Sequence, residues 1–427
     1  MKSLFIAFGV VLAGTVSVFL LLSQDVSFDD SDLLLEKIRV PETENAFSVF
    51  ERATNEMESI ESFDLSAEEH EKMVEILEGG EWDAELVESA VSKNSGALLY
   101  IDEFLQFSVL QFPELEDPEN YTANLLLRSM GEWRVLARLK ALQSLALLKR
   151  GREKEAFDQA MNIVRFGQTW EDAPRPFLIQ YLVGSYIKGI GLETMRMMLP
   201  DSSLTSQDLL SLARELENYG ANKESLKTTM KGEYMTIMNA LSSDFLFGNL
   251  DLSSNTLFED LLAKSPYHFK LNETKLLFAE GFRVYISNLD QEYYSQIEKS
   301  ESPFLYFYPE SAWQMFVAPN SIGKLVFYMI MVNTDLARLA AFEDVAVQGT
   351  RTMFALRAYY QDNGSLPETL DALAPNYLNS PPRDPFDGNV LRFSPQEGLV
   401  YSIGQDLQET AEDKSLEDGT AFQFEIR

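Results

Sequence analysis

Apolar residues recur with helical spacing along most of this 427-residue chain, and this spacing constrains the fold more than any other feature. In Tyr121–Lys149, leucines three or four residues apart fall on one face of a helix. Gly151 then ends that helix, and 153–170 forms its antiparallel partner. No strand pattern occurs before Val390. We therefore predict a mainly α protein, with an all-helical domain of helical hairpins over 25–345.

The turn between these two helices, 145–160, is similar to the inner turn of a tetratricopeptide repeat. Gly151 would end the first helix, and Ala156 and Ala160 would allow the two helices to approach closely. The sequence carries no second copy at a fixed period, and one such unit does not make a solenoid. We expect an ordinary helical hairpin.

The net charge limits the kinds of partner that the protein can bind. A formal net charge of −32 argues against nucleic acid and against docking onto anionic lipid. Acids concentrate in 25–119, whereas 120–170 holds more bases than acids. Two interpretations remain open: separate solvated faces, or an acidic N-terminal arm packed against a basic helical pair. Exposed ion pairs contribute little, so charge alone does not decide between them.

Histidine and cysteine usage limits the possible chemistry. The absence of cysteine excludes disulfides, iron–sulfur clusters and cysteine nucleophiles. The two histidines, His70 and His268, stand in contexts typical of a solvated helix face and of a packed or surface position. They give little basis for a zinc site or a Ser-His-Asp triad. Phosphate-loop, dinucleotide and nucleophile-elbow motifs are also missing.

The N-terminus predicts a membrane anchor. Lys2 is followed by the uncharged, apolar stretch Leu4–Leu22, which is long enough to span a bilayer. A small-x-small cleavage site is not evident after it. We predict a signal anchor over 1–24, with a cleaved signal as the alternative. Lys2 favours a cytoplasmic N-terminus and an exported body.

The C-terminal part, 346–427, predicts a small α+β module. A long helix from Asn320 would stop at Asn363-Gly364, and a short helix would restart at Ser365. Prolines then favour an extended crossing segment, followed by strands over 390–394, 399–403 and 421–426.

This module resembles the C-terminal half of the type II secretion major pseudopilin. The residues that carry the resemblance are Ala355, Leu356, Tyr359, Asp362, Asn363, Gly364, Leu366, Pro367, Leu370, Pro382, Asp384, Pro385, Gly388, Asn389, Tyr401, Ser402, Gly404 and Asp406. The whole layout also resembles uncharacterised, membrane-anchored bacterial envelope proteins. The N-terminus lacks the pseudopilin leader and the Glu that opens its apolar helix, so we do not expect assembly into a pseudopilus.

The resemblance implies a calcium loop after Tyr401. Asp406 matches the family's first loop aspartate, but Leu407 replaces the usual glycine. The remaining oxygen ligands would be Glu409, Asp413 and Asp418. The alternative is an acidic, solvated loop without metal. The cofactor expected is therefore calcium or none.

Two function classes follow. We favour a single-pass protein of the bacterial inner membrane, with its body in the periplasm, that binds protein partners of the cell envelope as a scaffold. A link to secretion comes only from the pseudopilin resemblance. The alternative is a hydrolase that uses paired carboxylates of the helical domain, which requires two acids about 5–10 Å apart in a pocket. The sequence favours a non-enzymatic role.

Overall fold

The computed structural model describes residues 23–36, 39–59, 65–112, 121–174, 177–242, 265–294, 318–331, 336–404 and 421–423. The predicted anchor Leu4–Leu22 and the predicted calcium ligands Asp406, Glu409, Asp413 and Asp418 lie outside these residues. The chain divides into two compact units. The smaller consists of 1–36, 230–291 and 296–336, and the larger of 37–229, 292–295 and 337–427.

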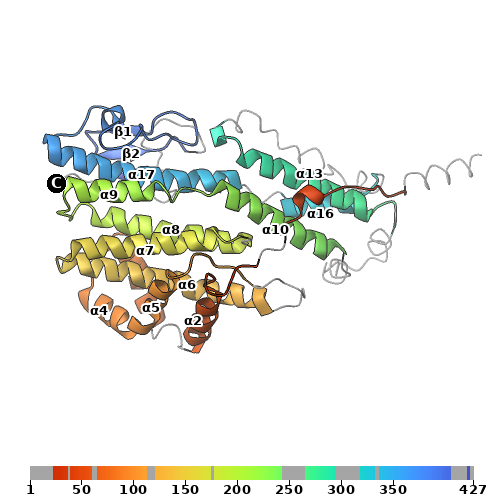
Figure 1. Cartoon of the computed structure of the whole chain (residues 1–427), viewed down its shortest axis with the longest axis horizontal. Coiled ribbons are helices and arrows are strands. Elements are labelled where there is room, and N and C mark those ends of the chain that lie inside the picture. Colours follow the sequence, from red (N-terminus) through yellow and green to blue (C-terminus); the bar gives the residue numbers. More distant parts are fainter. Residues whose placement is uncertain are drawn as a thin grey trace, which may run out of the picture. The chain divides into compact units, whose positions relative to one another are not determined.

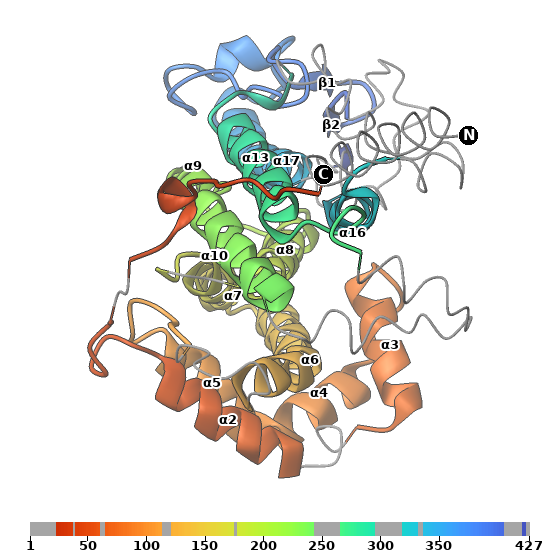
Figure 2. The same ribbon diagram turned by 90° about the vertical axis from the view of Figure 1, so that its right-hand side faces the viewer.

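The larger unit is a stack of helices capped by a small sheet (Figure 1). Its helices are α2 (Phe47–Ser59), α3 (Ala67–Leu77), α4 (Ala84–Lys93), α5 (Ser95–Phe104), α6 (Tyr121–Lys149), α7 (Glu153–Glu171), α8 (Leu178–Met198), α9 (Ser206–Leu216) and α17 (Leu336–Asn363). Figures 1 and 2 both show α7 and α8 side by side. The predicted helical hairpin is confirmed as α6 and α7, which Gly151 separates in the left-handed conformation, at φ +73°.

Aromatic rings fill the core between α2, α5, α6 and α7. Trp133 of α6 stacks on Phe50 at 5.6 Å between ring centroids and meets Phe166 of α7 at 5.4 Å. Phe104 of α5 packs edge-to-face on Phe166 at 4.9 Å. These four side chains are fully buried, so the apolar faces predicted from periodicity meet in one core.

Two helix starts follow from capping chemistry. Ser66 accepts a hydrogen bond from the backbone N–H of Glu69, whose carboxylate accepts one from the backbone N–H of Ser66. This capping box opens α3. Thr205 and Asp208 form the same reciprocal pair at the start of α9.

The apolar stretch expected as one long helix contains α16 (Ser321–Met331) and α17, and 332–335 between them lie outside the described residues. Within the described part of the chain, Ser321–Asn363 is the one stretch long and apolar enough to cross a membrane, judged by length and composition. This is weak evidence for a span, because a core helix passes the same test. Much of α17 is buried against the larger unit's core.

The C-terminal segment carries a three-stranded antiparallel sheet in the order β1-β2-β3. Its strands are β1 (Arg392–Ser394), β2 (Leu399–Tyr401) and β3 (Ala421–Gln423). The short helix predicted after Ser365 is only a 3₁₀ turn, Leu370–Leu373. The position 345/346, predicted as a domain boundary, lies inside α17, so one continuous helix joins the helical part to this segment.

Asp384 ties the segment together. Its buried carboxylate accepts hydrogen bonds from the backbone N–H of Ile403 at 2.7 Å and from the Ser402 hydroxyl at 2.9 Å. It also accepts from the backbone N–H of Phe386 and from the Arg392 guanidinium. Two motifs that the sequence analysis singled out, around Asp384 and around Ser402, are therefore joined by one side chain.

The smaller unit is built on α13 (Leu271–Leu289) and α16. It also contains the 3₁₀ helix η1 (Ser31–Leu33) and the C-terminal portion of α10 (Lys223–Ser242), because the division between the units falls after Thr229. Phe278 of α13 and Phe327 of α16 meet edge-to-face at 5.2 Å. The tyrosine hydroxyl of Tyr285 donates to the Met331 carbonyl. Phe278 comes before Tyr285 in α13, and their partners Phe327 and Met331 follow in the same order in α16. The two helices therefore run parallel.

Candidate functional site

A close approach of α7 and α8 places a lysine inside the larger unit. A side chain at Gly184 would come within 2.7 Å of the Gly167 carbonyl oxygen. A side chain at Gly191 would come within 2.9 Å of the Ala160 carbonyl oxygen. Glycine is needed at both positions because the two backbones nearly touch there. Lys188, one turn after Gly184, lies against α7 beside Gly167, and its side chain is fully buried.

Lys188 lies between two carboxylates. Its Nζ is 2.7 Å from Glu171 Oε2 and also forms an ion pair with Glu343 of α17. It donates a third hydrogen bond to Gln168 Oε1 at 2.8 Å. The side chains of Lys188 and Glu171 are fully buried, and that of Glu343 is 4% exposed. The hydroxyl of Tyr181 donates to Glu343 at 3.1 Å.

Burial and mutual repulsion set the protonation of this cluster. Burial, and then the neighbouring Glu343, raise the pKa of Glu171 well above its usual range, and Lys188 offsets only part of this. Burial opposes the charge on Lys188, but the two carboxylates outweigh it and raise its pKa. Lys188 thus supplies the positive charge between two buried carboxyls, and a low-dielectric core favours groups whose charges offset one another.

Asp344, the residue after Glu343, is a half-buried acid. Burial raises its pKa from 3.8 to about 6, against the opposing effect of a hydrogen bond from the Ala221 backbone. That N–H donates to Asp344 Oδ1 at 2.9 Å. Asp344 is thus a carboxyl that titrates below neutral pH within the larger unit.

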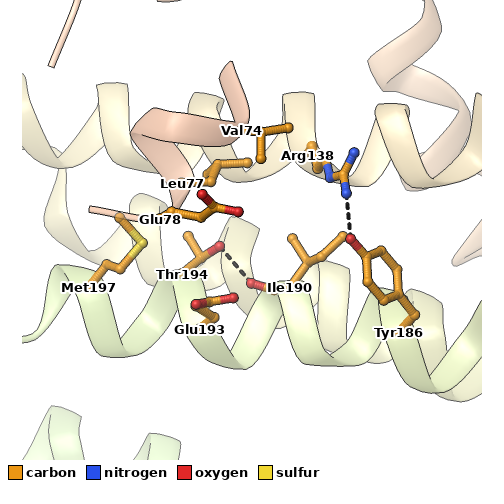
Figure 3. Close-up of a pocket in the computed structure, with 9 residues that line it drawn as sticks. All are labelled: Val74, Leu77, Glu78, Arg138, Tyr186, Ile190, Glu193, Thr194 and Met197. Carbon is orange, nitrogen blue, oxygen red and sulfur yellow. Dashed lines mark hydrogen bonds between the residues drawn. The ribbon is translucent and has the colours of Figure 1, made fainter. Parts of the chain in front are cut away.

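A surface groove lies on another side of α8. Its apolar walls are Val74 and Leu77 of α3 and Ile190 and Met197 of α8. The remaining lining residues are Glu78, Arg138, Tyr186, Glu193 and Thr194. Figure 3 shows Glu78 and Glu193 on facing sides of the groove, with Arg138 directed toward the Tyr186 hydroxyl at one end.

Tyr186 forms an exposed arginine–aromatic cluster at this end. Its side chain is 43% exposed. Arg138 and Arg134 lie over its ring, with guanidinium carbons 5.7 and 5.8 Å from the ring centroid. Arg138 also donates a hydrogen bond to the Tyr186 hydroxyl. Leu182, one turn earlier on α8, is also exposed. Tyrosine and arginine of this kind are enriched where proteins bind proteins.

Ion pairs join the acid-rich and base-rich segments. Lys140 Nζ lies 3.0 Å from Asp102, and Arg150 lies 2.7 Å from Glu88. Lys140 is buried, whereas Asp102 is 41% exposed. These contacts favour the packed arm over two separately solvated faces.

The predicted metal ligands and the histidines are not brought together by the described structure. Asp406, Glu409, Asp413 and Asp418 all fall in 405–420, outside it. Among the residues that it does describe, no group of three or more His, Asp or Glu side chains could hold a metal ion. His70 is half-buried, and burial, then Arg138, lower its pKa.

Sequence reasoning missed the Lys188 cluster, although a signal was present. Lys188 is the only charged residue between Phe177 and Leu192. Helical spacing also puts it on the face that carries Tyr181, Gly184 and Gly191. A lone charge on a face of small and apolar residues indicates a buried, paired side chain. Its partner Glu343 lies far away in the sequence and could not be named from spacing.

Comparison of the chain with protein-family models, with curated proteins and with solved structures found no match. The groove and the buried cluster are therefore interpreted from the structure of this chain alone.

Proposed function

We propose that the chain is a membrane-anchored protein of the bacterial cell envelope, with its body outside the cytoplasm, that binds a protein partner in the α3–α6–α8 groove. The observation that carries this proposal is the exposed Tyr186 with two arginines over its ring, next to an apolar groove. Rigid aromatic and arginine side chains beside an apolar floor are the usual anchors of protein interfaces. The apolar stretch Leu4–Leu22 supports the anchor and the exported address.

The groove defines the partner's chemistry. Val74, Leu77, Ile190 and Met197 suit an aliphatic side chain of the partner. The arginine end suits an acidic group, which would pair with Arg138. A short helical or extended segment with one acid beside an apolar residue fits both features. A role beside secretion machinery remains part of the proposal, through the pseudopilin-like C-terminal segment.

The hydrolase alternative needs a carboxylate pair that substrate can reach. The pair Glu171 and Glu343 does not meet that need, because both side chains are buried around Lys188. The facing acids Glu78 and Glu193 lie in the groove beside apolar side chains. They are the pair on which the alternative would rest.

Affinity purification of the full-length chain from detergent-solubilised membranes tests the proposal. We expect one partner to co-purify with the unaltered chain and with Leu99→Ala, which alters an exposed leucine on α5. Arg138→Glu should lose it. If the partner is retained by Arg138→Glu, the groove is not its binding site. Turnover of a glycoside panel that is lost in Glu193→Gln would instead favour the hydrolase.

A further inference from the structure

The segment that follows the predicted anchor is fastened to α13 at two levels. Asp25 lies three residues after Leu22, and its carboxylate accepts hydrogen bonds from the backbone N–H groups of Asn272 and Glu273 at 2.8 and 2.9 Å. The residue at the helix's own N-cap position, Lys270, makes no capping hydrogen bond with its side chain. A residue far away in the sequence therefore caps this helix, where a carboxylate is also favoured by the helix dipole.

The second level is three turns further along the same helix. Arg283 pairs with the Asp32 carboxylate at 2.6 Å and donates to the backbone carbonyl of Asp29 at 2.6 Å. Between these points, the Tyr234 hydroxyl of α10 donates to Asp30 at 2.7 Å. Leu33, which ends this segment, is buried. We call Asp25–Leu33 the strap.

The strap has a direction. It runs from the first turn of α13, at Asn272, to Arg283, a distance of about 16 Å along the helix axis. Asp25 is the end nearer the anchor, and three residues of extended chain reach at most about 10 Å. If the predicted anchor spans the bilayer up to Leu22, chain leaving it would meet the N-terminal end of α13 and continue toward its C-terminal end.

The same end of the unit presents aromatic side chains. Tyr267 and Phe269, both half-buried, directly precede α13. The backbone N–H groups of Asn320 and Ile322, where α16 begins, donate to the carbonyls of Tyr267 and His268 at 2.8 and 2.9 Å. The starts of both helices and these aromatics therefore share one end. Tyrosine is enriched at the water–lipid boundary.

We infer that the strap holds the starts of α13 and α16 against the lipid surface, so that α13 points away from the membrane. The partner of this surface is the headgroup layer into which the chain's own anchor inserts. The inference rests on the proposed anchor, and it assigns a role to the carboxylates of Asp25, Asp30 and Asp32: they fix the smaller unit to its membrane exit point.

The absence of cysteine makes the test direct. Asn272→Cys and Ser287→Cys place single thiols near the two ends of α13, about 22 Å apart along its axis. Each full-length variant is labelled with a fluorescent donor and reconstituted into phosphatidylcholine vesicles that carry an acceptor on the lipid headgroups. We expect roughly twofold more energy transfer from position 272 than from position 287, because of this separation.

Releasing the strap should remove that difference. The double change Asp25→Ala with Arg283→Ala removes both attachment levels, whereas Glu280→Ala alters an exposed acid of the same helix and is the control. Equal transfer from both positions in the chain with an intact strap overturns the inference. So does an unchanged difference in the double variant, provided that circular dichroism shows retained helix. Failure of the chain to co-float with vesicles overturns the proposed anchor and the inference together, whereas co-floating with equal transfer overturns the inference alone.

Discussion

Replacing Lys188 by methionine should be among the most destabilising single changes in the larger unit. It removes the cation between Glu171 and Glu343 and leaves two carboxyls in a site without solvent access. Lys188 Nζ lies 2.7 Å from Glu171 Oε2 and is also paired with Glu343, so the change leaves both carboxyls without their cation. Removing one partner of a buried pair typically costs about 3–5 kcal/mol.

The penalty should depend on pH. With Lys188 gone, the two buried carboxyls lose the cation between them, so burial and mutual repulsion should keep protons on them up to a higher pH than in the unaltered protein. A folded state that binds more protons than the unfolded state gains stability as pH falls. The gap between the two proteins should therefore shrink by up to about 1.4 kcal/mol for each unit from pH 7 toward pH 5.

Urea unfolding, followed through the buried tryptophans Trp133 and Trp170, measures this gap. Lys140→Met is the matched control, because Lys140 is equally buried but pairs with the half-exposed Asp102. We expect that change to cost no more than about 1 kcal/mol through its ion pair. A loss below about 1 kcal/mol for Lys188→Met, or one that does not vary between pH 5 and 7, would refute the account of the cluster.

Four further outcomes are expected. Because burial raises the pKa of Asp344 from 3.8 to about 6, the unaltered chain should lose about 2 kcal/mol relative to Asp344→Asn as pH rises from about 4 to 7, measured by urea unfolding. Asp384→Ala leaves buried donors unpaired and should cost about 3 kcal/mol, seen as faster hydrogen exchange in 382–404 but not in α7. Gly184→Ala should destabilise by about 1–3 kcal/mol, because its methyl meets a carbonyl oxygen of α7 at 2.7 Å. Gly189→Ala, which faces open space, should leave the melting temperature unchanged or raise it. If the loop that begins at Asp406 binds calcium, isothermal titration will show heat at or below millimolar concentration that Asp406→Ala abolishes, and absence of such heat removes the calcium prediction.

Helices that depend on local pattern were predictable from the sequence. The apolar face of α6 shows where that helix runs, and Gly151 marks where it ends. Ser66 and Glu69 mark the start of α3. The hairpin of β1 and β2 likewise follows from alternating residues between two turns. In each case the deciding interactions lie within a few residues of one another.

Features that depend on distant partners were not predictable. Glu343 of α17 meets Lys188 of α8 through tertiary packing of helices that are far apart in the sequence. The cap of α13 comes from Asp25, which no spacing rule connects to Asn272. The groove lies between α3 and α8. It could not be predicted, because helical periodicity indicates which faces are buried and not which gaps remain between helices.

Photo-crosslinking in intact membranes tests the proposed binding of a protein in the groove beside Tyr186 most directly. A photoreactive residue is placed at Met197, in the groove, or at the exposed Leu99 of α5. The account predicts one discrete adduct from position 197 that is absent from position 99 and falls about tenfold with Arg138→Glu, the equivalent of about 1.4 kcal/mol. The same adduct from both positions, or an adduct from 197 that Arg138→Glu leaves unchanged, would contradict it.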